Sequence, residues 1–75
     1  MKYVFRGNVI FEYIPNEKDK ERGRVIQHFI HEGPIAGFNY CGFIAEDWKL
    51  LADFFNTVYR HTQGENVELK DIKVN

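Results

Sequence analysis

The segment Glu46–His61 carries the clearest periodic pattern in the chain, because its apolar positions recur three and four residues apart. At about 100° per residue, this spacing predicts an amphipathic helix. Acidic residues open the segment and basic residues close it, as the helix dipole favours. Gly64 then stands where a helix terminator is expected. The stripe that we expect to pack on a sheet consists of Trp48, Leu51, Ala52, Phe55, Val58 and Tyr59.

The apolar arc of this helix covers roughly half of its circumference, whereas packing on one core usually takes ~100°. Leu50 and Phe54 widen the stripe on one side, and His61 lies at the same edge. We therefore predict a partner interface at Leu50, Phe54 and His61. The alternative for Leu50 and Phe54 is that the loop over residues 34–37 folds across them.

Residues 3–14 are rich in Val, Ile, Phe and Tyr, which is typical of extended structure. The Gly7-Asn8 dipeptide suits a two-residue turn, which would divide the stretch into a hairpin. A bulge at Gly7 within one long strand fits the sequence equally well. Strict alternation along the strand would place Val9, Phe11 and Tyr13 on one face of the sheet. It would place Ile10, Glu12 and Ile14 on the other face.

The next segment begins as a charged loop, since the signs nearly alternate between residues 17 and 22. Residues 24–32 then fit two structures. Their apolar spacing suits a helix that starts at Asn16, whereas Gly23 and the β-branched pair Val25-Ile26 favour a strand. We expect the strand, paired with residues 9–14.

Two further short strands are expected, over residues 38–44 before the helix and over residues 67–74 after it. The predicted order is therefore β-β-β-α-β, with one more N-terminal strand if the hairpin forms. This order indicates a single α+β domain over residues 1–75, in which one helix packs on one face of a small antiparallel sheet.

Seventy-five residues are near the lower limit for a domain that folds alone, and such cores supply only ~3–5 kcal/mol. Cys41 is the only cysteine, so no disulfide within the chain can add stability. A single thiol and an N-terminus without a long apolar run predict a cytoplasmic protein that is not bound to a membrane. Association with a second copy, as a homodimer, is the expected additional source of stability.

The charges are balanced, with ten basic and eleven acidic side chains and a net charge of −1. This balance disfavours a general nucleic-acid binder, because phosphate contacts dominate the affinity of such proteins. An aromatic sheet face could still stack single-stranded bases, which makes single-stranded nucleic acid the alternative partner. The residues for that alternative are Tyr3, Arg6, Phe11, Tyr13, Arg24, His28 and Tyr40.

No pattern in the sequence is typical of a catalytic or metal site. His28 and His31 would share a side only on a helix, and zinc needs three or four ligands. Cys41 has apolar neighbours, which predicts a buried and unreactive thiol. We therefore predict no enzyme activity, no metal and no cofactor. The expected function is that of a small protein-interaction or regulatory module that self-associates.

Overall fold

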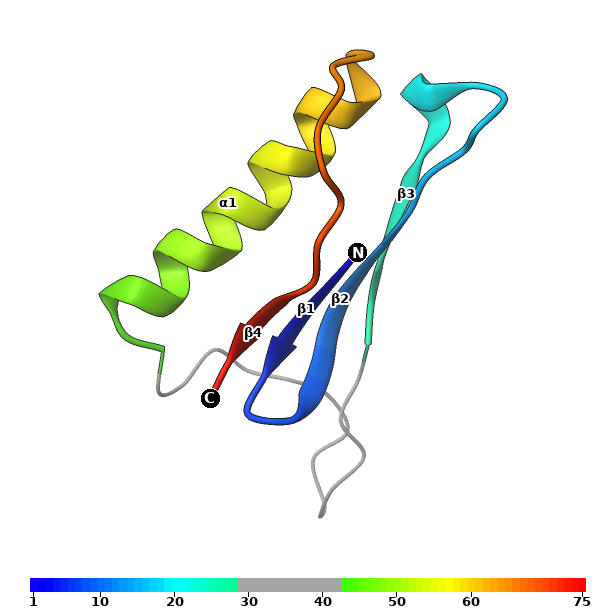
Figure 1. Cartoon of the computed structure of the whole chain (residues 1–75). Helices are drawn as coiled ribbons and strands as arrows, with labels where there is room; N and C mark the ends of the chain where they lie inside the picture. Colours follow the sequence, from blue (N-terminus) through cyan, green and yellow to red (C-terminus); the bar gives the residue numbers. More distant parts are fainter. Residues whose placement is uncertain (29–42) are drawn as a thin grey trace.

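The computed structural model describes residues 1–28 and 43–75, which form a four-stranded sheet with one helix on one face (Figure 1). The elements in chain order are β1 (Lys2–Phe5), β2 (Asn8–Ile14), the 3-10 turn η1 (Lys20–Arg22), β3 (Arg24–Gln27), α1 (Ala45–Thr62) and β4 (Ile72–Val74). The predicted α+β class and the β-β-β-α-β order are confirmed. The strand expected at residues 38–44 lies outside the described residues, apart from its last two positions.

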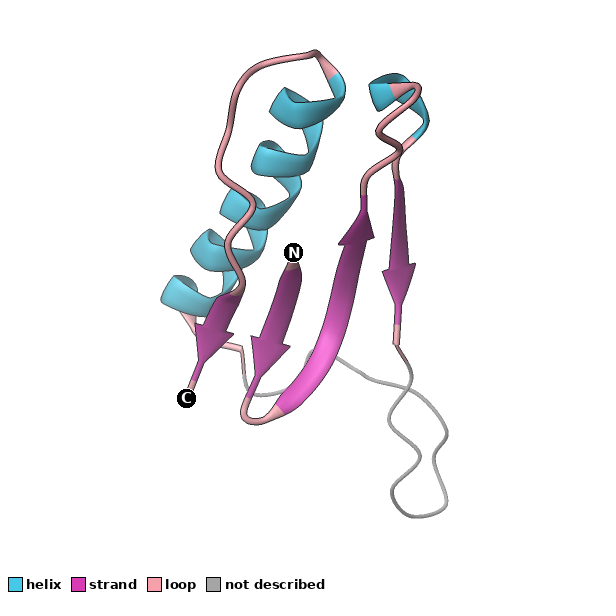
Figure 2. Cartoon of the chain, turned by 45° about the vertical axis from the view of Figure 1, so that its right-hand side comes forward, coloured by secondary structure: helices cyan, strands magenta, loops and turns pink. Residues whose placement is uncertain are grey.

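The strands lie in the order β3-β2-β1-β4 (Figure 2). The last strand of the chain, β4, therefore lies at an edge of the sheet, beside the first strand, β1, which is a central strand. β1 pairs antiparallel with β2, and β2 pairs antiparallel with β3. β4 runs parallel to β1. The sheet is therefore mixed rather than wholly antiparallel, because α1 and the segment after it carry the chain back to the end of the sheet where β1 begins.

A hairpin joins β1 to β2 through Arg6 and Gly7. Both residues have positive φ, at 50° and 84°, as a two-residue type I′ turn requires. Phe5 and Asn8 form the pair that closes the turn. The structure thus confirms the hairpin, and not the alternative of one long strand with a bulge at Gly7. Its two turn residues are Arg6 and Gly7, one position earlier than the predicted Gly7-Asn8.

A bulge in β2 changes which side chains face the helix. The pairing passes from Tyr3 with Phe11 to Val4 with Val9, which leaves Ile10 as the extra residue. Ile10 is fully buried beside Phe11 in the core. The predicted alternation was therefore wrong at this point, since Ile10 shares the helix-facing side and Val9 does not.

β3 and β4 are both short. The described part of residues 24–32 is a strand at Arg24–Gln27, as expected, and Val25 lies opposite Tyr13. β4 covers only the last three residues of the strand predicted over 67–74. Leu69 nevertheless packs against the core from the segment before β4, which accounts for the apolar pattern there.

The ends of α1 lie one residue outside the predicted helix at each terminus. At the N-terminus the Ile44 N–H donates to Oδ2 of Asp47 at 2.9 Å, so a first-turn carboxylate compensates for the lack of a capping side chain. At the C-terminus Gly64 adopts φ of 83°, and its N–H donates to the carbonyl of His61 at 3.0 Å. The predicted role of Gly64 as terminator is confirmed.

Candidate functional site

The face of α1 that packs on the sheet matches the predicted stripe at Leu51 and Val58 but is rotated away from Trp48 and Tyr59. Its buried side chains are Asp47, Leu51, Phe54 and His61. Leu50 and Val58 are half-buried and pack against the same core. By contrast, Trp48, Phe55 and Tyr59 are 47%, 43% and 61% exposed. Because the apolar arc spans roughly half of the helix, either rotation buries apolar side chains, and hydrophobicity alone does not choose between them.

Phe54 and His61 are therefore buried in the chain's own core, and Leu50 is half-buried against that core. Phe54 is fully buried, with its ring centroid 6.3 Å from that of Tyr3 and 6.2 Å from that of Phe11. His61 is only 7% exposed. The predicted interface was wrong at Phe54 and His61, whose side chains are buried, and it stays a prediction at the half-buried Leu50. The loop that we considered as their cover, residues 34–37, lies outside the described residues.

Two tyrosines of the sheet hold α1 in this rotation. The Tyr3 hydroxyl donates to the backbone carbonyl of Asp47 at 3.1 Å, near the N-terminal end of the helix. The Tyr13 hydroxyl and Nδ1 of His61 share a hydrogen bond of 2.8 Å near the other end. Among the described residues, no buried side-chain nitrogen or oxygen lacks a hydrogen-bond partner. Turning the helix about its axis would break both contacts and leave buried polar groups unpaired.

Burial raises the pKa of Tyr3 and the pKa of Tyr13 above the ordinary value of 10.0, and the negative charges of Asp47 and Glu17 respectively add to the effect. The folded state thus keeps these protons at a pH at which the unfolded chain releases them. We expect a stability contribution that is complete below pH 10 and is lost as the pH rises through the raised values. Urea unfolding at pH 8 and pH 11 should show this loss, and the double variant Tyr3→Phe with Tyr13→Phe should show less of it. An equal pH dependence in both proteins would contradict the assignment.

Four exposed apolar residues of α1 and Ile44, which directly precedes the helix, form one group that we call the outer flank. It consists of Ile44, Trp48, Ala52, Phe55 and Tyr59. The spacing of four, three and four residues from Trp48 to Tyr59 keeps these four on one side of the helix. The width of the arc correctly predicted a surplus apolar face, but that face is the outer flank and not the edge at Leu50 and Phe54. Contiguous exposed apolar patches of this kind mark interaction sites.

The core holds the outer flank in place from beneath. The Phe55 ring packs at centroid distances of 5.2 Å from Phe11 and 5.3 Å from Phe54. At the other end, the Phe43 ring lies 5.1 Å from Trp48 and 4.4 Å from Phe5. The flank is therefore a firmly supported surface.

The residues proposed for nucleic-acid binding do not form one exposed face. Tyr3, Phe11 and Tyr13 are buried between the sheet and α1. Arg24 lies on the opposite, open face of the sheet by strand alternation, where His28 Nε2 pairs with Glu12 Oε1 at 3.1 Å. The predicted aromatic stacking surface was therefore wrong for the three buried rings.

The remaining members of that set do not restore such a surface. Arg6 lies in the hairpin turn with its guanidinium 4.8 Å from the centre of the Phe5 ring. Tyr40 lies outside the described residues. Strand alternation gives the open face of the described sheet aliphatic and charged side chains rather than rings. These side chains are Lys2, Val4, Val9, Glu12, Ile14, Arg24, Ile26 and Lys73.

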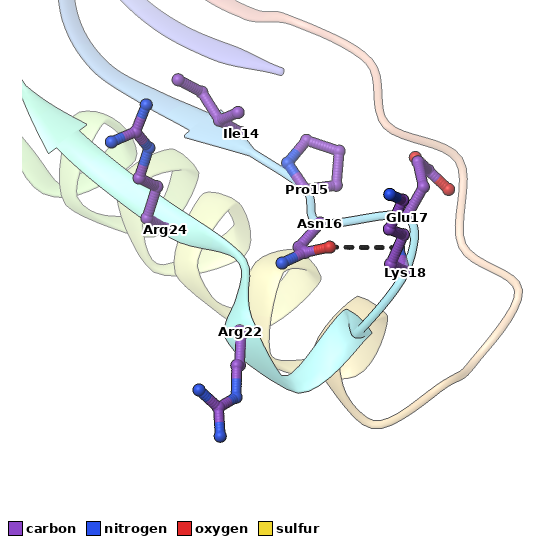
Figure 3. Close-up of a pocket in the computed structure, with 7 residues that line it drawn as sticks. All are labelled: Ile14, Pro15, Asn16, Glu17, Lys18, Arg22 and Arg24. Atoms are coloured by element: carbon purple, nitrogen blue, oxygen red, sulfur yellow. Dashed lines mark hydrogen bonds between the residues drawn. The ribbon is translucent and has the colours of Figure 1, made fainter.

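A hollow of about 440 Å³ opens where β2 leads into the charged loop (Figure 3). Its lining residues are Ile14, Pro15, Asn16, Glu17, Lys18, Arg22 and Arg24. Asn16 orders the loop, since its Oδ1 accepts the Lys18 N–H at 3.0 Å. The guanidinium groups of Arg22 and Arg24 point in opposite directions, and Arg22 pairs with Asp19 at 3.0 Å. The basic groups thus do not converge on one anion, and we assign no ligand to this hollow.

Within residues 1–28 and 43–75, no three metal-binding side chains lie close enough together to hold an ion. No helix in this part of the chain is long and apolar enough to cross a membrane. His31 and Cys41 lie outside the described residues. No protein-family model, no curated protein and no solved structure matches this chain. Functional inference therefore rests on the chain's own exposed side chains, of which the outer flank of α1 is the most distinctive group.

Proposed function

We propose that this chain is a non-catalytic protein-interaction module, which binds another protein chain through the outer flank of α1. The observation that carries the proposal is the exposure of Trp48, Phe55 and Tyr59 along one line of the helix. α1 lies on one face of the sheet (Figure 1), and these three side chains keep 43–61% of their surface exposed in the described structure. Covering these rings removes apolar surface from water, which drives association.

The residue types on the outer flank suit recognition of a protein. Tryptophan and tyrosine are enriched among the residues that contribute most to binding, and aromatic residues in general are enriched at interfaces. The contacts of Phe55 with Phe11 and Phe54 hold its ring before any partner arrives. Little side-chain freedom therefore has to be lost on binding, which favours affinity.

The biological role that fits such a surface is that of a small regulatory or accessory factor. The balanced charge does not favour a strongly charged partner. The single cysteine supports a reducing compartment, and we place the protein in the cytoplasm. The described strands supply no rings on the open face of the sheet for base stacking, and we do not propose nucleic acid as the partner.

Site-specific photocrosslinking tests the proposal. A benzophenone amino acid at Tyr59, in the full chain expressed in the source cells, should crosslink to another protein chain upon irradiation. The same amino acid at Lys70, which is exposed and lies outside α1, is the matched control. Crosslinks at position 59 and not at position 70 are the expected result. Equal crosslinking at both positions, or none at either, would contradict the proposal.

A further inference from the structure

We draw no further inference here: the strongest candidate, the group of aliphatic side chains on the open face of the described sheet, carries nothing, because the charged side chains among them are of both signs and nothing in the structure shows what covers this face.

Discussion

Phe54→Ala should destabilise the fold by about 3–5 kcal/mol, because it removes a fully buried ring from the centre of the core. The ring of Phe54 contacts Tyr3 and Phe11 of the sheet and Phe55 of the helix, so no neighbour can easily fill the cavity. Small domains have ~0.05–0.15 kcal/mol of stability per residue. The loss would therefore consume much of the stability of a 75-residue chain, and a large unfolded fraction is expected at 37 °C.

Phe55→Ala is the matched control, since the same atoms are removed one position further along α1. Phe55 is 43% exposed, and we expect this variant to lose about 1 kcal/mol, owing mainly to its contact with Phe11. Urea unfolding followed by circular dichroism gives both values. A larger loss for Phe55→Ala than for Phe54→Ala would show that α1 packs through the opposite edge, as its sequence alone suggested.

Gly23→Val should cost roughly 3 kcal/mol through overpacking. A Cβ on Gly23 would lie 2.6 Å from the Tyr13 hydroxyl oxygen and 2.7 Å from a carbon of the same ring. That ring is buried and hydrogen-bonded to His61, so it cannot move aside without breaking this contact. The backbone of Gly23 is ordinary, with φ of −60°, and the whole expected cost is steric.

Arg24→Val controls for the introduction of valine beside β3, because Arg24 is exposed and valine suits a strand. It should leave the midpoint of thermal unfolding nearly unchanged, whereas Gly23→Val should lower it by ten degrees or more, at ~4–8 °C for each kcal/mol. If the two variants unfolded at the same temperature, Tyr13 would not occupy the position against Gly23 that the structure gives it.

Features encoded over a few neighbouring residues could be predicted from the sequence. The spacing of apolar residues located α1 to within one residue at each end, and Gly64 marked its C-terminus. The β-branched pair Val25-Ile26 identified a strand against the competing helical spacing. In each case the preference is local, because backbone sterics and hydrogen bonding within one element decide the outcome.

The rotation of α1 could not be predicted because distant contacts determine it. The apolar arc permits two packings. The choice between them depends on the hydrogen bonds of Tyr3 with Asp47 and of Tyr13 with His61. The two residues of the first bond are separated by 44 positions in the chain, and those of the second by 48. Nothing near Asp47 or His61 in the sequence indicates that each will meet a tyrosine of the sheet. The candidate site was consequently placed on the wrong edge of a helix whose surplus apolar surface had been recognised correctly.

The sheet shows the same limitation. Residues of β2 are apolar at consecutive positions, which indicates that alternation fails somewhere but does not say where. The bulge at Ile10 is defined only by the pairing with β1. The parallel direction of β4 likewise follows from where α1 returns the chain, which is a property of the assembled fold.

The account depends most on the outer flank of α1 being a surface that binds another protein chain, and photocrosslinking of flank variants tests this directly. A benzophenone amino acid at Ala52, an exposed position of the flank, should crosslink to another protein chain in the source cells. Adding Asn66→Glu, which introduces one negative charge at an exposed position outside α1, should leave these crosslinks in place, whereas Tyr59→Glu introduces the same charge on the flank and should remove them with an unchanged circular dichroism spectrum. Crosslinks that persist in Tyr59→Glu, or that are absent throughout, would contradict the account.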